Sequence, residues 1–247
     1  MMNLNGSTLN SMRKKSLNLN VLTVDLVCRY LTQTREMYGD RVYSAHSLSA
    51  DSLETYESPS GFELTYESLG GFELAINQCQ RCALGGTRTE FVFGVGDPHS
   101  DLVFVGEAPG REEDLKGEPF VGRAGKLLDK ILAAIHLTRD QVYICNVLKC
   151  RPPDNRTPSA DEIETCMPYL EQQLSIINPK LIVALGATAA HSLLSVKTSL
   201  AQLRSKIWNW NGYDVVVTYH PAALLRNPTY KRPAWEDFQW IQKIMQD

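Results

Sequence analysis

From residue 101 onwards the chain contains four short, nearly continuous runs of apolar and mostly β-branched residues, and this pattern limits the possible folds more than any other feature. The runs are Leu102–Val105, Val142–Ile144, Leu181–Leu185 and Val215–Val217. A continuous apolar run, rather than an alternating one, is typical of a strand that is covered on both faces. We therefore expect each run to be a buried strand.

Helical patterns separate these runs. They cover residues 123–136, 159–177, 187–194 and about 234–246, and Ser159 with Glu162 forms a capping-box signature at the start of the second. Strands that alternate with helices predict a parallel sheet. The sequence therefore predicts an α/β fold with a central four-stranded parallel sheet and helices on both of its faces.

The first 74 residues have a different character and are predicted to be a poorly structured N-terminal extension. A helix is expected only at residues 17–37, where apolar residues recur at helical spacing. Residues 55–64 read TYESPSGFEL and residues 65–74 read TYESLGGFEL. Two copies are too few for a solenoid, so we interpret the repeat as a duplicated linker whose second copy also fits the start of a helix leading to Cys79. The predicted domain is residues 75–247.

Composition excludes several classes of protein. The 25 basic and 28 acidic residues give a net charge of −3, which excludes a histone-like basic surface but not a local basic groove. Six cysteines in 247 residues are too few for a disulfide-stapled secreted scaffold. No apolar run approaches the length of a membrane span. We therefore expect a cytoplasmic protein that has no membrane partner.

Polar residues follow the predicted strands, at the edge of a parallel sheet where ligands bind. Gly106, Glu107, Ala108, Pro109 and Gly110 follow the first strand. Asn146, Lys149, Cys150 and Arg151 follow the second, and His220 follows the fourth. Any of these residues alone is compatible with a structural role, but their convergence predicts a site. The glycine-rich loop matches neither a dinucleotide fingerprint nor a Walker loop.

Four cysteines form a second pattern. Cys79 and Cys82 form a C-x-x-C, whereas Cys150 follows a strand and Cys166 lies within a predicted helix. Four thiolates drawn from such different elements suit an iron–sulfur cluster, and a structural zinc ion remains the alternative. Cys28 and Cys145 are interpreted as ordinary buried thiols.

Several long motifs together resemble the family 4 uracil-DNA glycosylases, the iron–sulfur branch of their superfamily. They are GEAPGREED at 106–114, GEPFVGRAG at 117–125, NVLKCRPPDNR at 146–156 and HPAALLRNP at 220–228. The resemblance covers roughly residues 75–247. It implies that the chain flips uracil out of DNA and hydrolyses its N-glycosidic bond without lyase activity, and that Cys79, Cys82, Cys150 and Cys166 hold a [4Fe–4S] cluster.

The resemblance also implies roles for the residues at the strand ends. Phe120 matches the aromatic residue that stacks on the base, Asn146 the residue that reads the base edge, and His220 the residue that stabilises the departing uracil anion. The base site implied by the resemblance further includes residues 106–110, Glu113, which would exclude thymine, and Asn155. Ala108 of this chain matches family 4, whereas the best-known branch has a water-orienting Asp at that position. Glu107, Glu113 or backbone groups are therefore the candidates for orienting water.

The remaining predictions concern DNA. Leu224 lies where the superfamily inserts an apolar wedge into the emptied stack, and Arg226 would hold a phosphate. Lys149 and Arg151 lie in an acid-poor run beside the predicted site and are expected to contact phosphates. We expect a monomer that acts on uracil-containing DNA, either single- or double-stranded.

Two other functions fit the sequence less well. A protein that binds or covalently traps uracil-DNA without turnover would carry an additional histidine after the stacking aromatic, and residues 121–130 contain none. A zinc-dependent base deaminase would need H-x-E together with P-C-x-x-C. The chain has no H-x-E, and Gln78 rather than Pro precedes Cys79.

Overall fold

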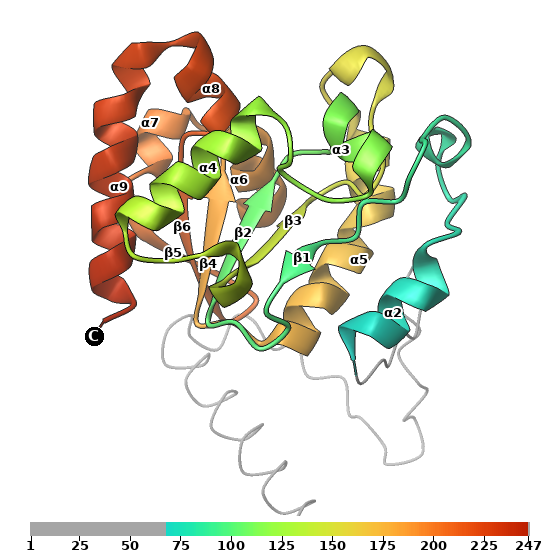
Figure 1. Ribbon diagram of the computed structural model, residues 1–247, viewed down its shortest axis with the longest axis horizontal. Coiled ribbons are helices and arrows are strands. Elements are labelled where there is room, and N and C mark those ends of the chain that lie inside the picture. The colour runs from blue at the N-terminus through green and yellow to red at the C-terminus, as the bar shows by residue number, and fades with distance from the viewer. Residues whose placement is uncertain (1–67, 247) are drawn as a thin grey trace, which may run out of the picture. The chain divides into compact units, whose positions relative to one another are not determined.

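The computed structural model describes residues 68–246, and these form an α/β domain around one mixed sheet (Figure 1). The predicted helix at 17–37, the rest of residues 1–67 and Cys28 lie outside the described residues. Within residues 68–246, no helix is long and apolar enough to span a membrane.

The centre of the sheet consists of the four predicted strands, all parallel. They are β2 (Leu102–Gly106), β3 (Tyr143–Asn146), β4 (Leu181–Leu185) and β6 (Tyr213–Thr218). The order in the sheet is β1-β3-β2-β4-β6-β5. The register pairs Gly106 with Asn146 and Leu185 with Thr218, so the carboxyl ends of neighbouring strands lie side by side. Every residue of β2, β3 and β4 is buried, as the continuous apolar runs predicted.

Two antiparallel edge strands complete the sheet and were not predicted. β1 (Val95–Gly96) pairs with β3, and β5 (Ile207–Trp210) pairs with β6. β5 alternates exposed and half-buried residues, because only one of its faces is covered. The prediction of a four-stranded parallel sheet is therefore confirmed for the core and extended at both edges.

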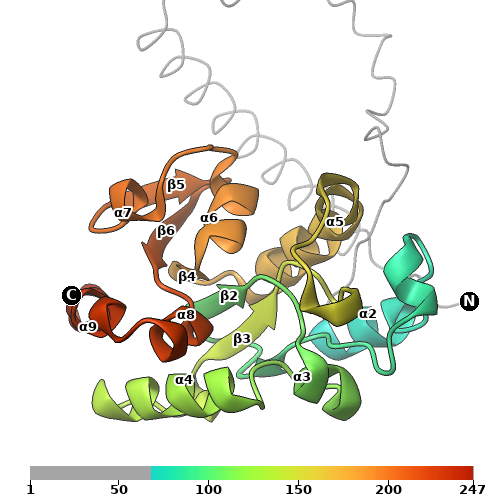
Figure 2. The ribbon, with the colours of Figure 1, turned by 90° about the horizontal axis from the view of Figure 1, so that it is seen from above.

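Helices cover both faces of the sheet, as Figure 2 shows. α4 (Arg123–Ala134) and α9 (Lys231–Ile244) cover one face, where Leu128 and Phe238 pack on Phe104 in a continuous apolar core. α5 (Ala160–Ile177) and α6 (Ala187–Leu194) cover the other face. The predicted capping box is present, since Ser159 Oγ accepts a hydrogen bond from Glu162 N and Glu162 accepts one from Ser159 N.

Shorter elements connect this framework. The short helices are α3 (Arg111–Lys116), α7 (Leu200–Leu203) and α8 (Pro221–Arg226). The 3₁₀ turns are Ala83–Gly86, Arg139–Gln141, Pro153–Asn155 and Pro228–Tyr230. α9 begins at Lys231, three residues before the predicted start.

α2 (Leu69–Ile76) crosses the predicted domain boundary at residue 74. Its Phe72 is fully buried and packs edge-on against Phe93 and Tyr169, with ring centroids 5.6 Å and 6.1 Å apart. Ser68 caps the helix by accepting a hydrogen bond from Gly71 N. The division of the chain into an extension and a domain stays a prediction, and these contacts favour placing it before Ser68.

Candidate active site

A cavity of about 580 Å³ opens at the carboxyl ends of the parallel strands. Its walls come from the segments that follow β2, β3, β4 and β6. The chain leaves β2 in one direction to form β3 and later returns on the other side of β2 to form β4. A parallel sheet binds ligands where the strand order reverses in this way, so the position of the cavity agrees with the prediction.

All of the predicted base-site residues line this cavity except Gly106, which is the last residue of β2. The lining residues that the sequence predicted are Glu107, Ala108, Pro109, Gly110, Glu113, Phe120, Asn146, Asn155 and His220. The structure therefore brings the predicted set together. The individual roles assigned to these residues stay predictions.

Gly106 makes room for two side chains that meet above it. A Cβ atom at this position would overlap Asn146 Oδ1 and would lie 2.6 Å from Phe120 Cζ. Asn146 is only 2% exposed, and its Oδ1 is the single buried side-chain polar atom without a hydrogen-bond partner among the described residues. A buried acceptor without a partner is costly. Asn146 Oδ1 is therefore available for an N–H group of a ligand in the cavity.

Phe120 is held in an unusual backbone conformation. Its φ is 55°, in the left-handed region that bulky residues avoid. Arg139 donates hydrogen bonds to the carbonyls of Pro119 (2.7 Å) and Phe120 (3.1 Å) and to Asp129 Oδ1 (3.0 Å). Gly125 packs against the Phe120 carbonyl, and a Cβ atom on Gly125 would overlap that carbonyl. Together, these contacts direct the Phe120 ring towards the cavity.

His220 faces Phe120, with ring centroids 5.4 Å apart and an interplanar angle of 30°. It is the N-cap of α8, and its Nδ1 accepts a hydrogen bond from Ala222 N (3.1 Å). A backbone amide can only donate, so a neutral His220 must carry its proton on Nε2. Burial, followed by the positive charge of Arg226, lowers the pKa of His220 to about 4, while Glu113 opposes this shift. His220 is therefore a neutral Nε2–H donor at physiological pH.

The two candidate carboxylates have different surroundings. Glu113 Oε1 accepts hydrogen bonds from Val121 N (3.0 Å) and Gly122 N (2.9 Å), which fixes the loop that carries Phe120. Glu107 accepts a hydrogen bond from the Thr188 hydroxyl, near the start of α6. Glu107 and Thr188 both line the cavity. Glu113 thus has a structural task, whereas Glu107 is anchored beside the cavity by one hydroxyl.

The loop after β3 brings Asn155 to the cavity. Asp154 and Asn155 both have a φ of 53°, which Asn and Asp tolerate better than other residues. Arg151 Nε donates to Asn155 Oδ1 at 2.8 Å and so holds this turn. Arg151 therefore has a structural contact in addition to its predicted phosphate contact. Arg226 is exposed and lines the cavity, at the end of α8.

Two of the side chains predicted to contact DNA are buried in this structure. Lys149 is fully buried, and its Nζ donates to Asn146 O (2.7 Å) and to Gln173 Oε1 of α5. It links the end of β3 to α5 and cannot reach a phosphate. Leu224 is 2% exposed because α8 turns it into the protein, so it cannot act as a wedge from this position. The neighbouring Leu225 is 39% exposed.

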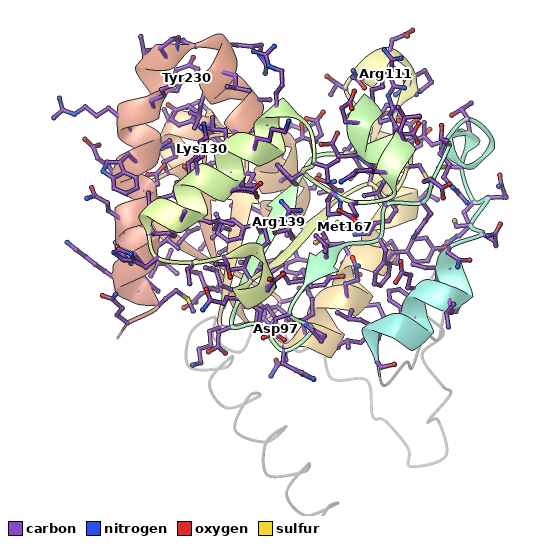
Figure 3. The ribbon with its side chains drawn as sticks, in the orientation of Figure 1. Asp97, Arg111, Lys130, Arg139, Met167 and Tyr230 are labelled. Atoms are coloured by element: carbon purple, nitrogen blue, oxygen red, sulfur yellow. The ribbon has the colours of Figure 1, made fainter. Side chains whose placement is uncertain are left out.

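The predicted site left out several residues of the cavity wall, among them Thr188, Tyr219 and Tyr230. Thr188 follows the end of β4 by three residues, Tyr219 directly precedes His220, and Tyr230 follows α8. The strand-end rule that selected His220 applies equally to Thr188 and Tyr219. No strand end in the sequence points to Tyr230, which is labelled in Figure 3. It reaches the cavity only through the turn between α8 and α9.

The four predicted cluster cysteines come from three regions. Cys79 and Cys82 follow α2, Cys150 follows β3, and Cys166 lies in α5. Cys150 interacts electrostatically with Cys79 and Cys82, and Cys166 with Cys82 and Cys150. Within residues 68–246, no three His, Cys, Asp or Glu side chains stand close enough together to hold one metal ion. Cys145 is fully buried in β3, in agreement with its interpretation as a core thiol.

Hydrogen-bond donors point at two of these sulfur atoms. Cys79 Sγ accepts from the Tyr169 hydroxyl (3.2 Å) and from Arg81 N (3.5 Å). Cys150 Sγ accepts from Arg88 Nη1 (3.3 Å). Such donors, one of them a guanidinium, stabilise negative charge on sulfur. At Cys150 burial outweighs the Arg88 contact and raises the pKa of the thiol.

Comparisons with known proteins agree with this geometry. The family model of the uracil DNA glycosylase superfamily matches residues 93–240, which include every strand of the sheet and the whole cavity wall. A type-4 uracil-DNA glycosylase of Archaeoglobus fulgidus is 46% identical over 177 residues, which are 68% of this chain and 89% of the relative. One from Thermotoga maritima is 48% identical over 154 residues, which are 62% of this chain and 80% of that protein. The chain therefore belongs to the uracil DNA glycosylase superfamily and, within it, to the type-4 uracil-DNA glycosylases.

Proposed function

We propose that the chain removes uracil from DNA by hydrolysing the N-glycosidic bond of a flipped nucleotide and leaves an abasic site. The observation that carries this proposal is the unpaired, buried Oδ1 of Asn146 beside the Phe120 ring. A side-chain amide accepts from uracil N3–H through Oδ1 and donates to uracil O4 through Nδ2. Cytosine offers the opposite polarity at both positions, so a fixed Asn146 rejects it.

His220 is proposed to stabilise the leaving base. As the glycosidic bond breaks, negative charge develops on the uracil ring, chiefly near O2. The neutral Nε2–H of His220, fixed by the Ala222 amide at Nδ1, offers a donor to that oxygen. A preorganised donor of this kind contributes roughly 3–4 kcal/mol to catalysis. Because His220 is already neutral, it needs no proton transfer to act.

Glu107 is proposed to orient the attacking water. The Thr188 hydroxyl anchors its carboxylate beside the cavity. Glu113 is less suited to this role, because one of its oxygens already accepts two backbone hydrogen bonds. Its contribution is to position the Phe120 loop and so to shape the side of the pocket that faces the base.

The DNA contacts are proposed to surround the cavity mouth. Arg226 is exposed there and would hold a phosphate, and the half-buried Arg151 would do so beside Asn155. Leu225 replaces Leu224 as the candidate wedge, because it is the exposed apolar side chain of α8. DNA binding by a single copy of the chain in the cytoplasm stays part of this proposal.

Cys79, Cys82, Cys150 and Cys166 are proposed to hold a [4Fe–4S] cluster. Four neighbouring thiols, two of which accept hydrogen bonds at sulfur, fit the cluster, which is held by four cysteine thiolates. Each ligand of such a cluster binds a different iron, so its sulfurs stand farther apart than those around a single zinc ion. A structural zinc ion held by the same four thiolates is the alternative. When bound, the cluster would link three chain segments and take no part in bond cleavage.

A uracil-DNA binder or covalent trap without turnover is not favoured. The type-4 relatives are named as glycosylases, and residues 121–130 contain no histidine. The decisive experiment incubates the protein with uracil-containing oligonucleotides and measures abasic sites under single-turnover conditions. Asn146→Asp is expected to reduce uracil excision, because a carboxylate cannot donate to O4. A stoichiometric complex that releases no uracil would favour the trap and contradict the proposal.

A further inference from the structure

Two tyrosines form a flat stack at the edge of the cavity. The rings of Tyr219 and Tyr230 are 4.5 Å apart between centroids and only 8° from parallel. Both residues line the cavity, and Tyr219 directly precedes His220. Tyr230 remains 37% exposed although Tyr219 covers one of its faces. The stack leaves the opposite face of the Tyr230 ring uncovered by Tyr219, and more than a third of the residue is exposed.

A buried ion pair fixes the base of this stack. The Arg204 guanidinium lies 4.7 Å from the centre of the Tyr219 ring. Arg204 donates to both carboxylate oxygens of the buried Asp237, at 2.7 and 2.8 Å, and Asp237 also accepts from Thr218 Oγ1 at 2.6 Å. Arg204, Tyr219 and Tyr230 thus form a column that is anchored in the core and ends in an exposed aromatic surface.

The charges around the exposed end of the column suit an anionic partner. Arg226 and Lys231 are exposed on either side of Tyr230 in the sequence, and Arg226 lines the same cavity. Figure 3 places Tyr230 at the end of the molecule towards which the parallel strands run. An aromatic surface flanked by cations, beside a pocket for a flipped base, matches the chemistry of sites that bind single-stranded nucleic acid.

We propose that the exposed surface of Tyr230 is a stacking site for the nucleobase next to the target uracil in single-stranded DNA. This inference rests on the proposed function, since it takes the cavity to hold a flipped uracil. In a duplex the neighbouring base is paired and stacked on its other side, so moving it onto Tyr230 would break those contacts. An unpaired neighbour is free to stack on the ring.

A double-mutant cycle tests this contact by removing each partner in turn. The ligand is a single-stranded oligonucleotide in which 2′-fluoro-2′-deoxyuridine resists hydrolysis, and the base on its 5′ or 3′ side is present or replaced by an abasic analogue. Tyr230→Leu removes the ring from the protein, whereas Tyr230→Phe keeps it. Base–aromatic stacking predicts that Tyr230→Leu weakens binding of the complete strand about five-fold or more, and that Tyr230→Phe does not.

The coupling pattern decides the outcome. The effect of Tyr230→Leu is expected to disappear when the contacted neighbouring base is absent, on one side of the uracil only, and to be smaller for the matching duplex. Trp235→Leu is the matched control, because Trp235 is 38% exposed but does not line the cavity. Equal losses with and without the neighbouring base, equal losses for the duplex, or no measurable binding of the single strand would overturn the inference. Excision of ordinary uracil, measured separately, reports on the proposed function.

Discussion

The strained conformation of Phe120 leads to a prediction about Arg139, which lies outside the cavity wall. Arg139 donates to the carbonyls of Pro119 and Phe120 and pairs with Asp129 (Arg139 is labelled in Figure 3). We expect Arg139→Met to release this loop, because methionine fills a similar volume but donates no hydrogen bond. Phe120 would then relax from its left-handed conformation and leave the face of the base.

The size of the effect follows from two opposing contributions. Hydrogen bonds from a charged donor contribute about 1.5–3 kcal/mol each, and we use the lower value because the Arg139 side chain is 24% exposed. Two such bonds give about 3 kcal/mol, against about 1–2 kcal/mol for a left-handed residue other than glycine. Without Arg139 the cavity-facing conformer becomes a minor state, and apparent affinity falls with its population. We expect kcat/KM to fall about ten-fold or more.

The assay combines uracil excision with inhibition by free uracil and with urea unfolding. Arg139→Met should weaken both excision and inhibition by uracil, and Arg139→Lys should recover part of the loss, since an ammonium can still reach one carbonyl. Lys130→Met is the matched control, because it removes an exposed cation from α4 that makes neither contact. If Arg139→Met lowered the stability but left uracil inhibition unchanged, the proposed positioning of Phe120 would be refuted.

Three further predictions concern proton binding, the domain boundary and the metal. The rate of uracil excision should stay constant as the pH falls through 6.5 and decline only near the pKa of about 4 of His220, because burial keeps the ring neutral. A midpoint of the rate near pH 6.5 that disappears in His220→Ala would contradict this. The same shift means that the contribution of His220 to stability is complete above the unfolded pKa and is lost as the pH falls towards 4, which urea unfolding at several pH values measures. A chain that begins at Ser68 should fold like the full chain. A chain that begins at Ala75 loses the buried Phe72 and should be less stable to unfolding by about 3–5 kcal/mol. Equal urea midpoints for the two chains would contradict the packing of α2. Protein purified without oxygen should contain about four irons per chain, and Cys150→Ser should lose them; one zinc ion and no iron would contradict the cluster.

The sequence predicted the centre of the fold because the central strands are buried on both faces. Their apolar runs are continuous, and this pattern depends little on which elements cover them. β5 was not predicted, because its Trp208 and Trp210 are half-buried and alternate with exposed residues. Such a segment looks like a loop until its pairing with β6 is known. Whether an edge segment forms a strand depends on the neighbouring strand more than on the segment's own composition.

The unexpected burial of two site residues has a related cause. A lysine beside a predicted site resembles a surface cation, but Lys149 is buried, and Gln173, 24 residues away on α5, accepts a hydrogen bond from its Nζ. Nothing near Lys149 in the sequence reveals this partner. For Leu224 and Leu225, one step along a helix turns a side chain by about 100°. The packing of α8 therefore decides which leucine faces solvent, and the sequence motif alone does not reveal it.

Phe120 shows the same limit at the centre of the site. Its position in a motif predicted that it would stack on a base, but a local analysis of backbone preference would exclude its positive φ. The conformation exists because Gly125, five residues later, leaves room for the Phe120 carbonyl and Arg139, 19 residues later, donates to it. Local rules are broken most readily at functional sites, where surrounding contacts impose a conformation that the residue alone would avoid. The residues that stabilise such a conformation are therefore found by following the hydrogen bonds of its backbone, and here they lead to Arg139.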